Sequence, residues 1–589
     1  MILQALAQLY ERRSRDPDPA KRLPSPGLED KEIPFVVELR ADGSVVQIRD
    51  TRTLDGKKLR GQTFLVPQAV KKTSGVAANL LWDTAEYLLG ASSKAKPERL
   101  KEQQQAFKQR IQELAERAPD DAGLQAVLAF LADPQLDAQR GTPLWDELLL
   151  SNPVLSFELQ GDGGALVCQR PAVVSAVLKG GSSGDASAEA PQAMCLIEGQ
   201  VLPVERLHTA IKGVWGAQSS GANIVSFNLD AFNSYGKAQG GNAPVSARAA
   251  FAYTTALNAL LERDSRNRVQ VGDSSTVFWA DGESKFDGEF TLADFFGEPK
   301  PDRPDRGRDA VKALYQALRS GQLPVGEAST RFYVLGLAPN AARISVRFWL
   351  PGISFAELAP RIQQHFDDLR MVRRFEGDPE HPSLFRLLSS LALQGKLDNV
   401  PPRLAGEWMR SILEGSVLPA VLLNTAVMRC KAEQDVNYLR ACVLKAWLNR
   451  HARGQQASDH QHFKEELNMS QEEPAYRLGR LFATLERIQE QAQPGINATI
   501  RDRFYGAAST TPVAVFTTLL RLKNAHLKKL TQGQLIHFEK LIGEILQPLQ
   551  GFPRQLALAE QGQFALGYYH QRQAFYAKRS DDQQDNKEV

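Results

Sequence analysis

The hydrophobic pattern of this chain changes near residue 383, and that change limits the folds open to it. Before it, FVVELR (35–40) and SVVQIRD (44–50) flank an Asp-Gly pair and predict a hairpin. Residues 332–338 and 343–350 predict a second hairpin, while 2–13, 97–132 and 245–263 have helical spacing, the last with a good start at Ser246. After residue 383 almost every segment is helical, and 474–492 is one of the predicted helices. We therefore predict an α+β N-terminal region with mixed strands and helices, followed by an all-α helical bundle.

A chain of 589 residues is too long to fold around a single hydrophobic core, and this length indicates two to four domains. The polar stretch 454–470 has weak periodicity and is the best boundary. We expect an α+β region over 1–382, a helical connecting region over 383–468 and a helical bundle over 469–578. Residues 579–589 are predicted to be a disordered tail. Within the first region, 153–177 is predicted to return to strands.

Residues 211–246 are rich in glycine and in neutral polar side chains, and Asp230 is their only acid. Glycine lets a backbone approach a ligand closely, and small amides and hydroxyls offer donors and acceptors without charge. That chemistry suits a nucleic-acid surface, and a well-packed loop of turn residues is the alternative. The candidate contacts are Lys212, Gln218, Ser219, Ser220, Asn223, Asn228, Lys237 and Asn242.

A second candidate is Lys71, Lys72, Thr73 and Ser74, which precede a glycine and are followed by Asn79 at the start of a helix-like run. Two cations and two hydroxyls before a helix can bind phosphate. An ordinary helix entry with a capping Thr or Ser explains the same residues equally well.

The helical C-terminal part carries six cations that we assign weakly to a displaced strand or a guide–target duplex. They are Arg501, Arg503, Arg521, Lys523, Lys528 and Lys529. Phe564, Tyr568, Tyr569 and Phe575 could stack on bases, but their helical spacing favours core packing.

Catalytic signatures are poor. GGSSG at 180–184 matches a nucleophile elbow without the strand–turn–helix context that such a serine needs. His460 and His462 lack partners for a metal site, and the four cysteines form no CxxC pair and are predicted to be buried free thiols. We expect no catalytic residue, no metal and no cofactor, and therefore no enzyme. No stretch of about 20 apolar residues is present, so we expect a cytoplasmic protein.

Five blocks resemble one known family: MILQALAQLYERR (1–13), KKTSGVAANLLWDTAEYLLG (71–90), QSSGANIVSFN (218–228), FYVLGLAPNAARISVRFWL (332–350) and QGQFALGYYHQRQ (561–573). The chain is similar over nearly its whole length to the type I-C CRISPR-associated large subunit, the Csd family of the Cascade surveillance complex. The resemblance implies a complex with guide RNA and with the backbone and handle-binding subunits.

The resemblance also implies a function. Such a subunit recognises the protospacer-adjacent motif (PAM) in double-stranded target DNA, promotes strand separation and R-loop formation, and helps hold the displaced strand. It provides docking for a helicase-nuclease that is recruited later, and it cuts nothing itself. The two candidate groups in the α+β region would then lie beside the motif. Met469 would be an internal translation start for a small-subunit-like product.

Two other functions stay open. One is a nuclease or hydrolase of the same antiviral pathway, which needs a carboxylate or histidine constellation. The other is an RNA-only assembly scaffold that anchors the guide and never touches duplex DNA. Salt-dependent binding to duplex DNA in the absence of a guide would separate the PAM-recognising subunit from the RNA-only scaffold.

Overall fold

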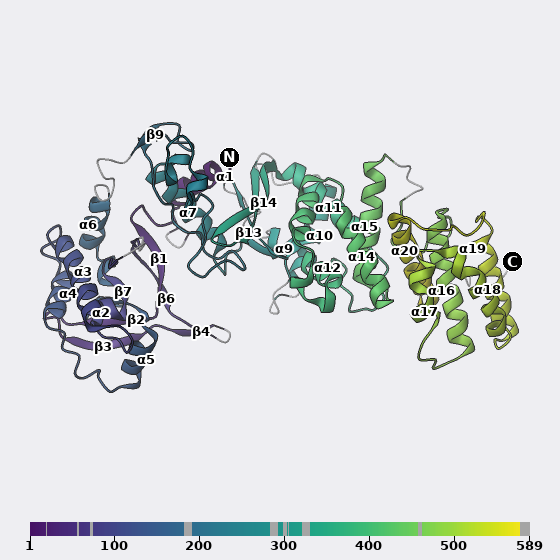
Figure 1. Ribbon diagram of the computed structural model, residues 1–589, viewed down its shortest axis with the longest axis horizontal. Helices are drawn as coiled ribbons and strands as arrows, with labels where there is room; N and C mark the ends of the chain where they lie inside the picture. The colour runs from purple at the N-terminus through teal and green to yellow at the C-terminus, as the bar shows by residue number, and fades with distance from the viewer. Residues whose placement is uncertain are drawn as a thin grey trace. The chain divides into compact units, whose positions relative to one another are not determined.

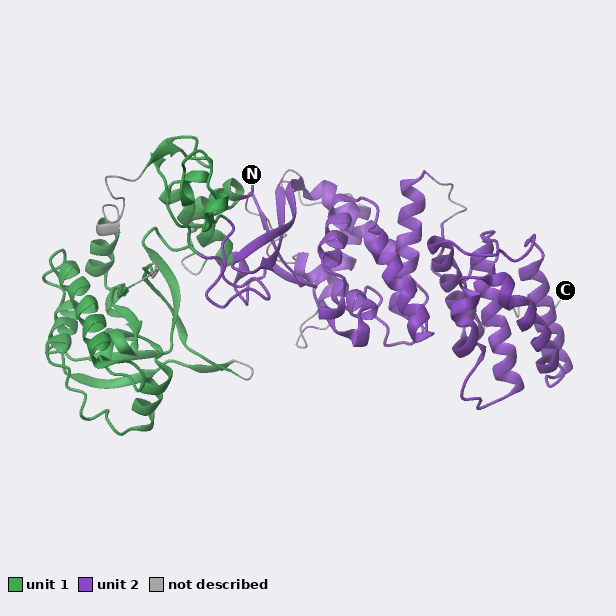
Figure 2. Ribbon diagram, viewed as in Figure 1, with its two compact units in different colours: residues 1, 3–209, 225–259 green, residues 2, 210–224, 260–589 purple. Residues whose placement is uncertain are grey.

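The structure is a computed structural model that describes residues 1–18, 21–55, 58–70, 75–181, 191–282, 292–298, 303, 305–320, 330–456 and 462–577. The chain forms two compact units (Figure 2). Unit 1 comprises residues 1, 3–209 and 225–259, and unit 2 comprises residues 2, 210–224 and 260–589. The glycine-rich block is therefore shared, since its first part belongs to unit 2 and its second part to unit 1.

Unit 1 is built on a four-stranded mixed sheet in the order β3-β2-β8-β7. Its strands are β2 (Phe35–Leu39), β3 (Val45–Asp50), β7 (Trp82–Thr84) and β8 (Val154–Leu159), and β2 and β8 are parallel. Helices α2 (Ala85–Leu89), α3 (Pro97–Ala115) and α4 (Ala122–Ala132) share one core with this sheet (Figure 1). Phe107 and Phe130 pack against Phe157, which joins both long helices to β8.

The remaining strands of unit 1 form three two-stranded sheets. They pair β1 (Leu28–Ile33) with β6 (Gln62–Pro67), β4 (Thr53–Asp55) with β5 (Lys58–Arg60), and β9 (Gln192–Met194) with β10 (Val201–Pro203). The other helices are α1 (Ile2–Arg13), α5 (Pro143–Ser151), α6 (Pro171–Gly181) and most of α7 (Ala247–Leu261). Tyr10 and Phe251 meet edge to face at 5.6 Å and join α1 to α7.

Unit 2 begins with an antiparallel sheet in the order β11-β12-β13-β14. Its strands are β11 (Arg268–Val271), β12 (Ser274–Ala280), β13 (Arg331–Asn340) and β14 (Arg343–Ser354). Phe278, Val334 and Leu350 face the main hydrophobic core, which helices complete. Every residue of β12 is buried, as expected for a strand covered on both faces.

Helices make up the rest of the described part of unit 2. The first group is α9 (Leu292–Phe296), α10 (Arg306–Ser320), α11 (Phe355–Leu369), α12 (Leu384–Leu391), α13 (Leu404–Glu414), α14 (Ala420–Glu433) and α15 (Tyr438–Gly454). The second is α16 (Pro474–Ala492), α17 (Ile500–Ala508), α18 (Pro512–Leu527), α19 (Gln532–Leu546) and α20 (Leu558–Tyr576).

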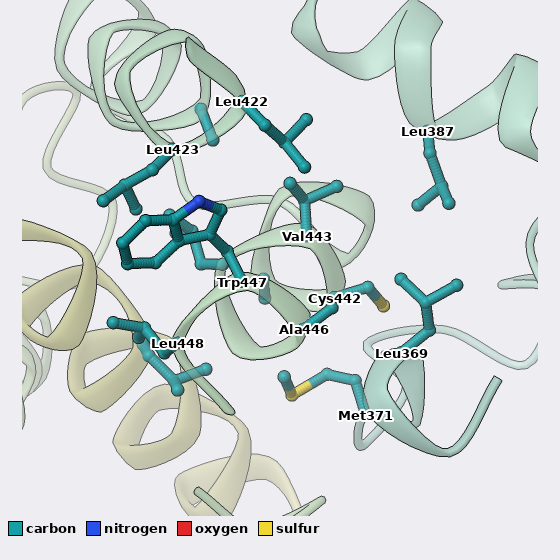
Figure 3. Close-up of a cluster of buried hydrophobic side chains, with 14 of the residues drawn as sticks. Leu369, Met371, Leu387, Leu422, Leu423, Cys442, Val443, Ala446, Trp447 and Leu448 are labelled. Carbon is teal, nitrogen blue, oxygen red and sulfur yellow. The ribbon is translucent and has the colours of Figure 1, made fainter. Parts of the chain in front are cut away.

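Helix α15 lies at the centre of this core and is buried continuously from Ala441 to Arg450. Figure 3 shows Val443 and Trp447 of α15 beside Leu422 and Leu423 of α14, with Leu387 of α12 and Leu369 of α11 nearby. One hydrophobic cluster runs from the sheet through α15 to α20. The helical part of unit 2 therefore shares its core with the sheet.

The predicted fold class is confirmed: strands and helices mix in the N-terminal region, and the chain is all helical from about residue 400 to 576. Both predicted hairpins are present, as are the helices at 2–13 and 474–492. The return to strands over 153–177 is wrong beyond β8, because residues 171–181 form α6. The four cysteines are buried and free, as predicted. None of the helices in the described ranges is long and apolar enough to cross a membrane.

The domain ranges predicted from the sequence stay a prediction. Residues 260–382 group with the helical region in unit 2, so the boundary between the compact units lies well before residue 382. GGSSG at 180–184 lies mostly outside the described residues, as do His460 and the tail after residue 577.

Candidate nucleic-acid interface

The first part of the glycine-rich block, residues 210–224, forms a loop that is anchored to the sheet of unit 2; we call it the sheet-docked loop. At its neck, Ile211 and Ala222 exchange two backbone hydrogen bonds of 2.8 and 2.9 Å. Asn223 continues the pairing to the β13–β14 turn: its N–H donates to the carbonyl oxygen of Ala342, and its carbonyl oxygen accepts from Ile344. The N–H of Trp215 donates to the Ser275 hydroxyl oxygen at 2.9 Å.

Glycine is required at two points of this loop. Gly213 has φ +82°, and a Cβ there would lie 2.6 Å from the carbonyl oxygen of Leu261. Gly221 has φ +94°, and a Cβ there would lie 2.9 Å from the carbonyl oxygen of Ile211. Both positions combine a left-handed backbone with a close approach that side chains exclude. The glycines therefore hold the loop tightly on its own unit.

The tip of the sheet-docked loop is a turn over residues 218–221, closed by a hydrogen bond from the N–H of Gly221 to the carbonyl oxygen of Gln218 at 2.9 Å. Gln218, Ser219 and Ser220 are exposed there, and Lys212 is exposed at the neck. The turn thus presents neutral donors and acceptors from a fixed backbone, which is the chemistry predicted for base edges and phosphates.

Asn223 differs from its predicted neighbours in this loop. Its backbone makes both hydrogen bonds to the β13–β14 turn, and its side-chain oxygen is buried. The oxygen is therefore shielded from a ligand, and Asn223 anchors the loop through its backbone; its predicted contact with DNA stays a prediction.

The second part of the block belongs to unit 1, and its residues 230–242 form what we call the tyrosine loop. The backbone at Gly240 and Val245 pairs with residues 204–206. The N–H of Glu205 donates to the carbonyl oxygen of Val245, and the N–H of Gly240 donates to the carbonyl oxygen of Arg206. The guanidinium of Arg206 donates to the side-chain oxygen of Gln239 at 2.9 Å. Asn228 and Lys237 are exposed, as the prediction requires.

Asn242 holds the tyrosine loop together. Its side-chain oxygen accepts from the N–H of Ser234 at 2.9 Å. Its side-chain nitrogen donates to the carbonyl oxygens of Lys237 and Gln239, each at 3.1 Å, and approaches the Asn233 oxygen at 3.3 Å. These contacts make Asn242 a clamp within the loop, and its predicted contact with DNA stays a prediction.

Two exposed aromatic residues were missed by the reasoning from sequence. Trp215 of the sheet-docked loop is 61% exposed, and Tyr235 of the tyrosine loop is 99% exposed. Single exposed aromatic rings stack well on nucleobases. The available signal was the presence of these two large rings in a stretch that otherwise consists mainly of glycine and small polar residues.

The second predicted group has one described member, since Lys71, Lys72, Thr73 and Ser74 lie outside the described residues. Asn79 is 5% exposed. Its side-chain oxygen accepts from the N–H of Val70 at 3.0 Å, and its own N–H donates to Asp83 at 2.8 Å. Asn79 therefore fixes the local fold of unit 1, which corrects its assignment to a DNA contact.

The C-terminal cations separate into exposed and engaged residues. Arg503, Arg521, Lys528 and Lys529 are exposed, whereas Lys523 forms an ion pair with Glu539 at 2.6 Å. Arg501 faces the interior, with its Nε 3.9 Å from Glu486, a carboxylate that is 1% exposed. The prediction for Arg501 is therefore corrected, because its position suits a structural ion pair.

Glu486 is the centre of a buried network in which the hydroxyls of Thr499 and Tyr568 each donate to its carboxylate at 2.6 Å. Burial, together with the nearby Glu486 charge, raises the pKa of Tyr568 well above its ordinary value. The phenol therefore stays protonated and remains a donor. Tyr568, like Phe564 and Tyr569, is buried, which confirms the core-packing alternative for these three aromatics.

Comparison with known protein families shows which family the chain belongs to. The family model described as "CRISPR-associated protein (Cas_Csd1)" matches residues 6–576. The chain belongs to the Csd1 family. It is thus a CRISPR-associated large subunit of type I-C, as the resemblance implied, and a component of a CRISPR Cascade complex. No curated protein matches the sequence.

For a Csd1-family chain, Met469 is the residue predicted to start a shorter product. It is 51% exposed and precedes α16, and its sulfur lies 3.0 Å from a guanidinium nitrogen of Arg480. Helices α16 to α20 follow it. Helix α20 also contacts the chain before Met469: the Tyr569 hydroxyl donates to the carbonyl oxygen of Val372 at 2.8 Å. A product starting at Met469 would contain these helices without that partner.

No three His, Cys, Asp or Glu side chains in the described part of this Csd1-family chain are grouped so that they could hold a metal ion.

Proposed function

We propose that this chain recognises the PAM in double-stranded target DNA and promotes strand separation and R-loop formation within the guide-RNA complex. The observation that carries the proposal is the turn at residues 218–221, an exposed set of neutral donors and acceptors on a loop tied to a β-sheet. A rigid, uncharged turn suits the readout of base edges in the narrow minor groove, which mostly presents acceptors.

Additional support comes from the charge of the glycine-rich block as a sequence. The block 211–246 has two lysines and one acid, so it does not repel phosphate. The net charge of the whole chain is only +3, and local surfaces must therefore supply most of the attraction to DNA. Lys212 and Lys237 would contact phosphates, while Gln218, Ser219 and Ser220 would contact bases.

We assign the exposed cations Arg503, Arg521, Lys528 and Lys529 to the displaced strand. Flexible cationic side chains that track a backbone hold single strands without reading sequence. In this proposal the chain also binds the backbone and handle-binding subunits, and it offers a docking surface to the helicase-nuclease that arrives after R-loop formation.

In this proposal the chain binds DNA without cutting it. The guide RNA is carried by the complex. A nuclease of the same pathway and an RNA-only scaffold are the alternatives. Cleavage of target DNA by the complex before the helicase-nuclease is added would favour the first. A complex whose duplex binding does not change when this chain is left out would favour the second.

The test is a binding assay on the guide complex assembled with and without this chain. The target duplex carries its correct flanking motif or a scrambled one. We expect discrimination only when the chain is present, and we expect the triple change Gln218→Ala, Ser219→Ala and Ser220→Ala to abolish it while assembly persists. Loss of one direct base contact should cost about 1–3 kcal/mol. Discrimination that persists without the chain would contradict the proposal.

We also propose that Met469 starts a small-subunit-like product. In the full chain, Gly562 of α20 lies against Leu423 and Leu444, so the product would expose an apolar strip that α14 and α15 cover. A second surface must then cover this strip. The test is to change the Met469 codon to Leu and look for the loss of a short species in the purified complex, with the Met428 codon changed to Leu as the control. A short species that survives the Met469 change would exclude this start.

A further inference from the structure

Tyr235 occupies a backbone conformation that tyrosine seldom adopts. Residues 234–237 form a turn in which the N–H of Lys237 donates to the carbonyl oxygen of Ser234 at 2.9 Å. The two central residues, Tyr235 and Gly236, have φ of +53° and +70°. Positive φ at both positions is the signature of a type I′ turn, in which Asn-Gly is the favoured pair. A tyrosine therefore stands where the turn favours asparagine.

This left-handed conformation is energetically unfavourable, and packing of the ring within the loop does not offset the cost. A left-handed conformation is unfavourable for a residue with a Cβ, and bulky residues in it are outliers that invite a functional explanation. Buried tyrosines recover such a cost through packing, but Tyr235 is 99% exposed. The fold of unit 1 thus gains no stability from the ring.

The loop around Tyr235 is held firmly. Asn242 binds the N–H of Ser234 and the carbonyl oxygen of Lys237, the two residues that flank the turn. Gly240 sits so close to residue 205 that a Cβ there would lie 2.1 Å from the carbonyl oxygen of Glu205. The ring is therefore presented to solvent on a fixed support, which lowers the entropy lost when a ligand binds it.

The residues beside the ring indicate the chemistry of that ligand. Asn233, Ser234 and Lys237 are exposed next to Tyr235. A flat π surface with an amide, a hydroxyl and a cation around it matches a nucleotide, which has a base to stack and a phosphate to bind. An apolar protein pocket would favour aliphatic neighbours, whereas these three side chains are polar.

We propose that Tyr235 stacks on a nucleobase of the target DNA at the recognised motif, and that the left-handed turn is retained in order to present the ring. This inference rests on the proposed function and assigns a base-stacking residue to it. It makes Tyr235 a positioning residue for the DNA, separate from the polar turn at residues 218–221.

The test uses the assembled guide complex and target duplexes that carry 2-aminopurine at one position at a time within and beside the motif. Tyr235→Asn is the informative variant, because asparagine suits the turn and lacks the ring. We expect unchanged or higher thermal stability of the chain together with roughly 5- to 150-fold weaker duplex binding. We also expect stronger 2-aminopurine fluorescence at one position, where quenching by the ring is lost. Tyr235→Phe should behave as the parent.

Phe375→Ala is the matched control, since Phe375 is also strongly exposed, at 64%, but lies in unit 2 outside the glycine-rich block. Parental binding and fluorescence in Tyr235→Asn would overturn the inference. If discrimination between motifs then still depends on this chain, the proposed function stands and only the role of Tyr235 fails. If discrimination does not depend on the chain, both fail. An equal loss in Tyr235→Asn and Phe375→Ala would also overturn the inference.

Discussion

Gly479 of α16 and Gly567 of α20 lie where the two helix backbones touch. A Cβ on Gly479 would lie 2.0 Å from the carbonyl oxygen of Phe564, and a Cβ on Gly567 would lie 2.0 Å from that of Tyr476. Each glycine thus leaves room for the backbone of the opposite helix. The contact brings together segments that are almost ninety residues apart in the sequence, and it holds the C-terminal helices at their closest approach.

The first prediction concerns this contact. Gly479→Ala should destabilise unit 2 by about 3 kcal/mol or more, because the helices must separate to admit one methyl group. The midpoint of urea unfolding, followed by circular dichroism, measures the change. Gly543→Ala in α19 is the matched control: no atom lies within 4 Å of its Cβ position, so the higher helix propensity of alanine should stabilise by about 0.5–1 kcal/mol. Equal effects at the two sites would contradict the close approach.

The second prediction is a loss of stability at mildly acidic pH. Burial lowers the pKa of His365 and of His570 to about 3. An unfolded histidine titrates near 6.5, so the unfolded chain binds more protons between these values and stability falls as pH falls. We expect the slope for each histidine to approach about 1.4 kcal/mol per pH unit toward pH 5, measured as the unfolding free energy between pH 6.5 and 5.

His570→Gln should reduce that slope, since glutamine can still bond the Tyr476 hydroxyl that lies 2.8 Å from Nδ1 of His570. Asp368 opposes the trend, because burial raises its pKa above the ordinary value of 3.8 and the folded chain therefore takes up this proton more readily than the unfolded chain as the pH falls. A flat dependence between pH 6.5 and 5 in the parent chain would show that the histidines are accessible to protons in the folded state.

The third prediction concerns the clamp in the tyrosine loop. Asn242→Ala should speed hydrogen exchange at the amides of Ser234 and Lys237. The Ser234 N–H loses the side-chain oxygen that accepts its hydrogen bond, and the turn that holds the Lys237 N–H loses the side chain that supports it. Duplex binding should weaken as a consequence. Lys237→Ala is the control for the loop, since only its backbone takes part in the turn. Mass spectrometry of exchanged peptides measures both variants, and equal exchange in the two would argue against a clamp.

The fourth prediction separates the C-terminal cations. The double variant Lys528→Ala and Lys529→Ala should lower the salt dependence of displaced-strand binding by about 1.4 in log–log slope, as expected for two lost phosphate contacts on a single strand. Lys523→Ala should change it less, because Lys523 is paired with Glu539. Arg501→Ala should instead lower the unfolding midpoint, because it removes the cation beside buried Glu486. An unchanged salt dependence in the double variant would show that the displaced strand does not contact Lys528 and Lys529.

Reasoning from sequence was reliable where periodicity and local signals agreed. Helix α16 was predicted at 474–492, where Pro474 provides a fixed first residue and the apolar positions repeat along one face. The start of α7 at Ser246 was also correct, since its hydroxyl accepts from the N–H of Ala249 at 3.1 Å. These elements depend on residues within one turn of one another. The helix at 171–181 was missed because Val173, Val174 and Val177 suit a strand equally well.

Individual polar residues were harder to assign, because the role of an amide depends on contacts made by distant parts of the chain. Asn79 and Asn242 looked like the other candidate DNA contacts in sequence, yet both bind backbone groups of their own surroundings. Arg501 looked like the other C-terminal cations until α16 placed Glu486 beside it. The exposure of Tyr235 could not be predicted either, since composition alone does not say which ring of a loop faces solvent.

The position of α20 has a consequence for how this protein is made. Its residues complete the core around α14 and α15, but they are synthesised more than a hundred residues after α15 ends at Gly454. At a synthesis rate of about 5–20 residues per second, the nascent chain would wait on the order of ten seconds with that apolar surface uncovered. A chaperone that binds the ribosome-attached chain during this interval would meet α14 and α15 in a state that the finished protein never shows.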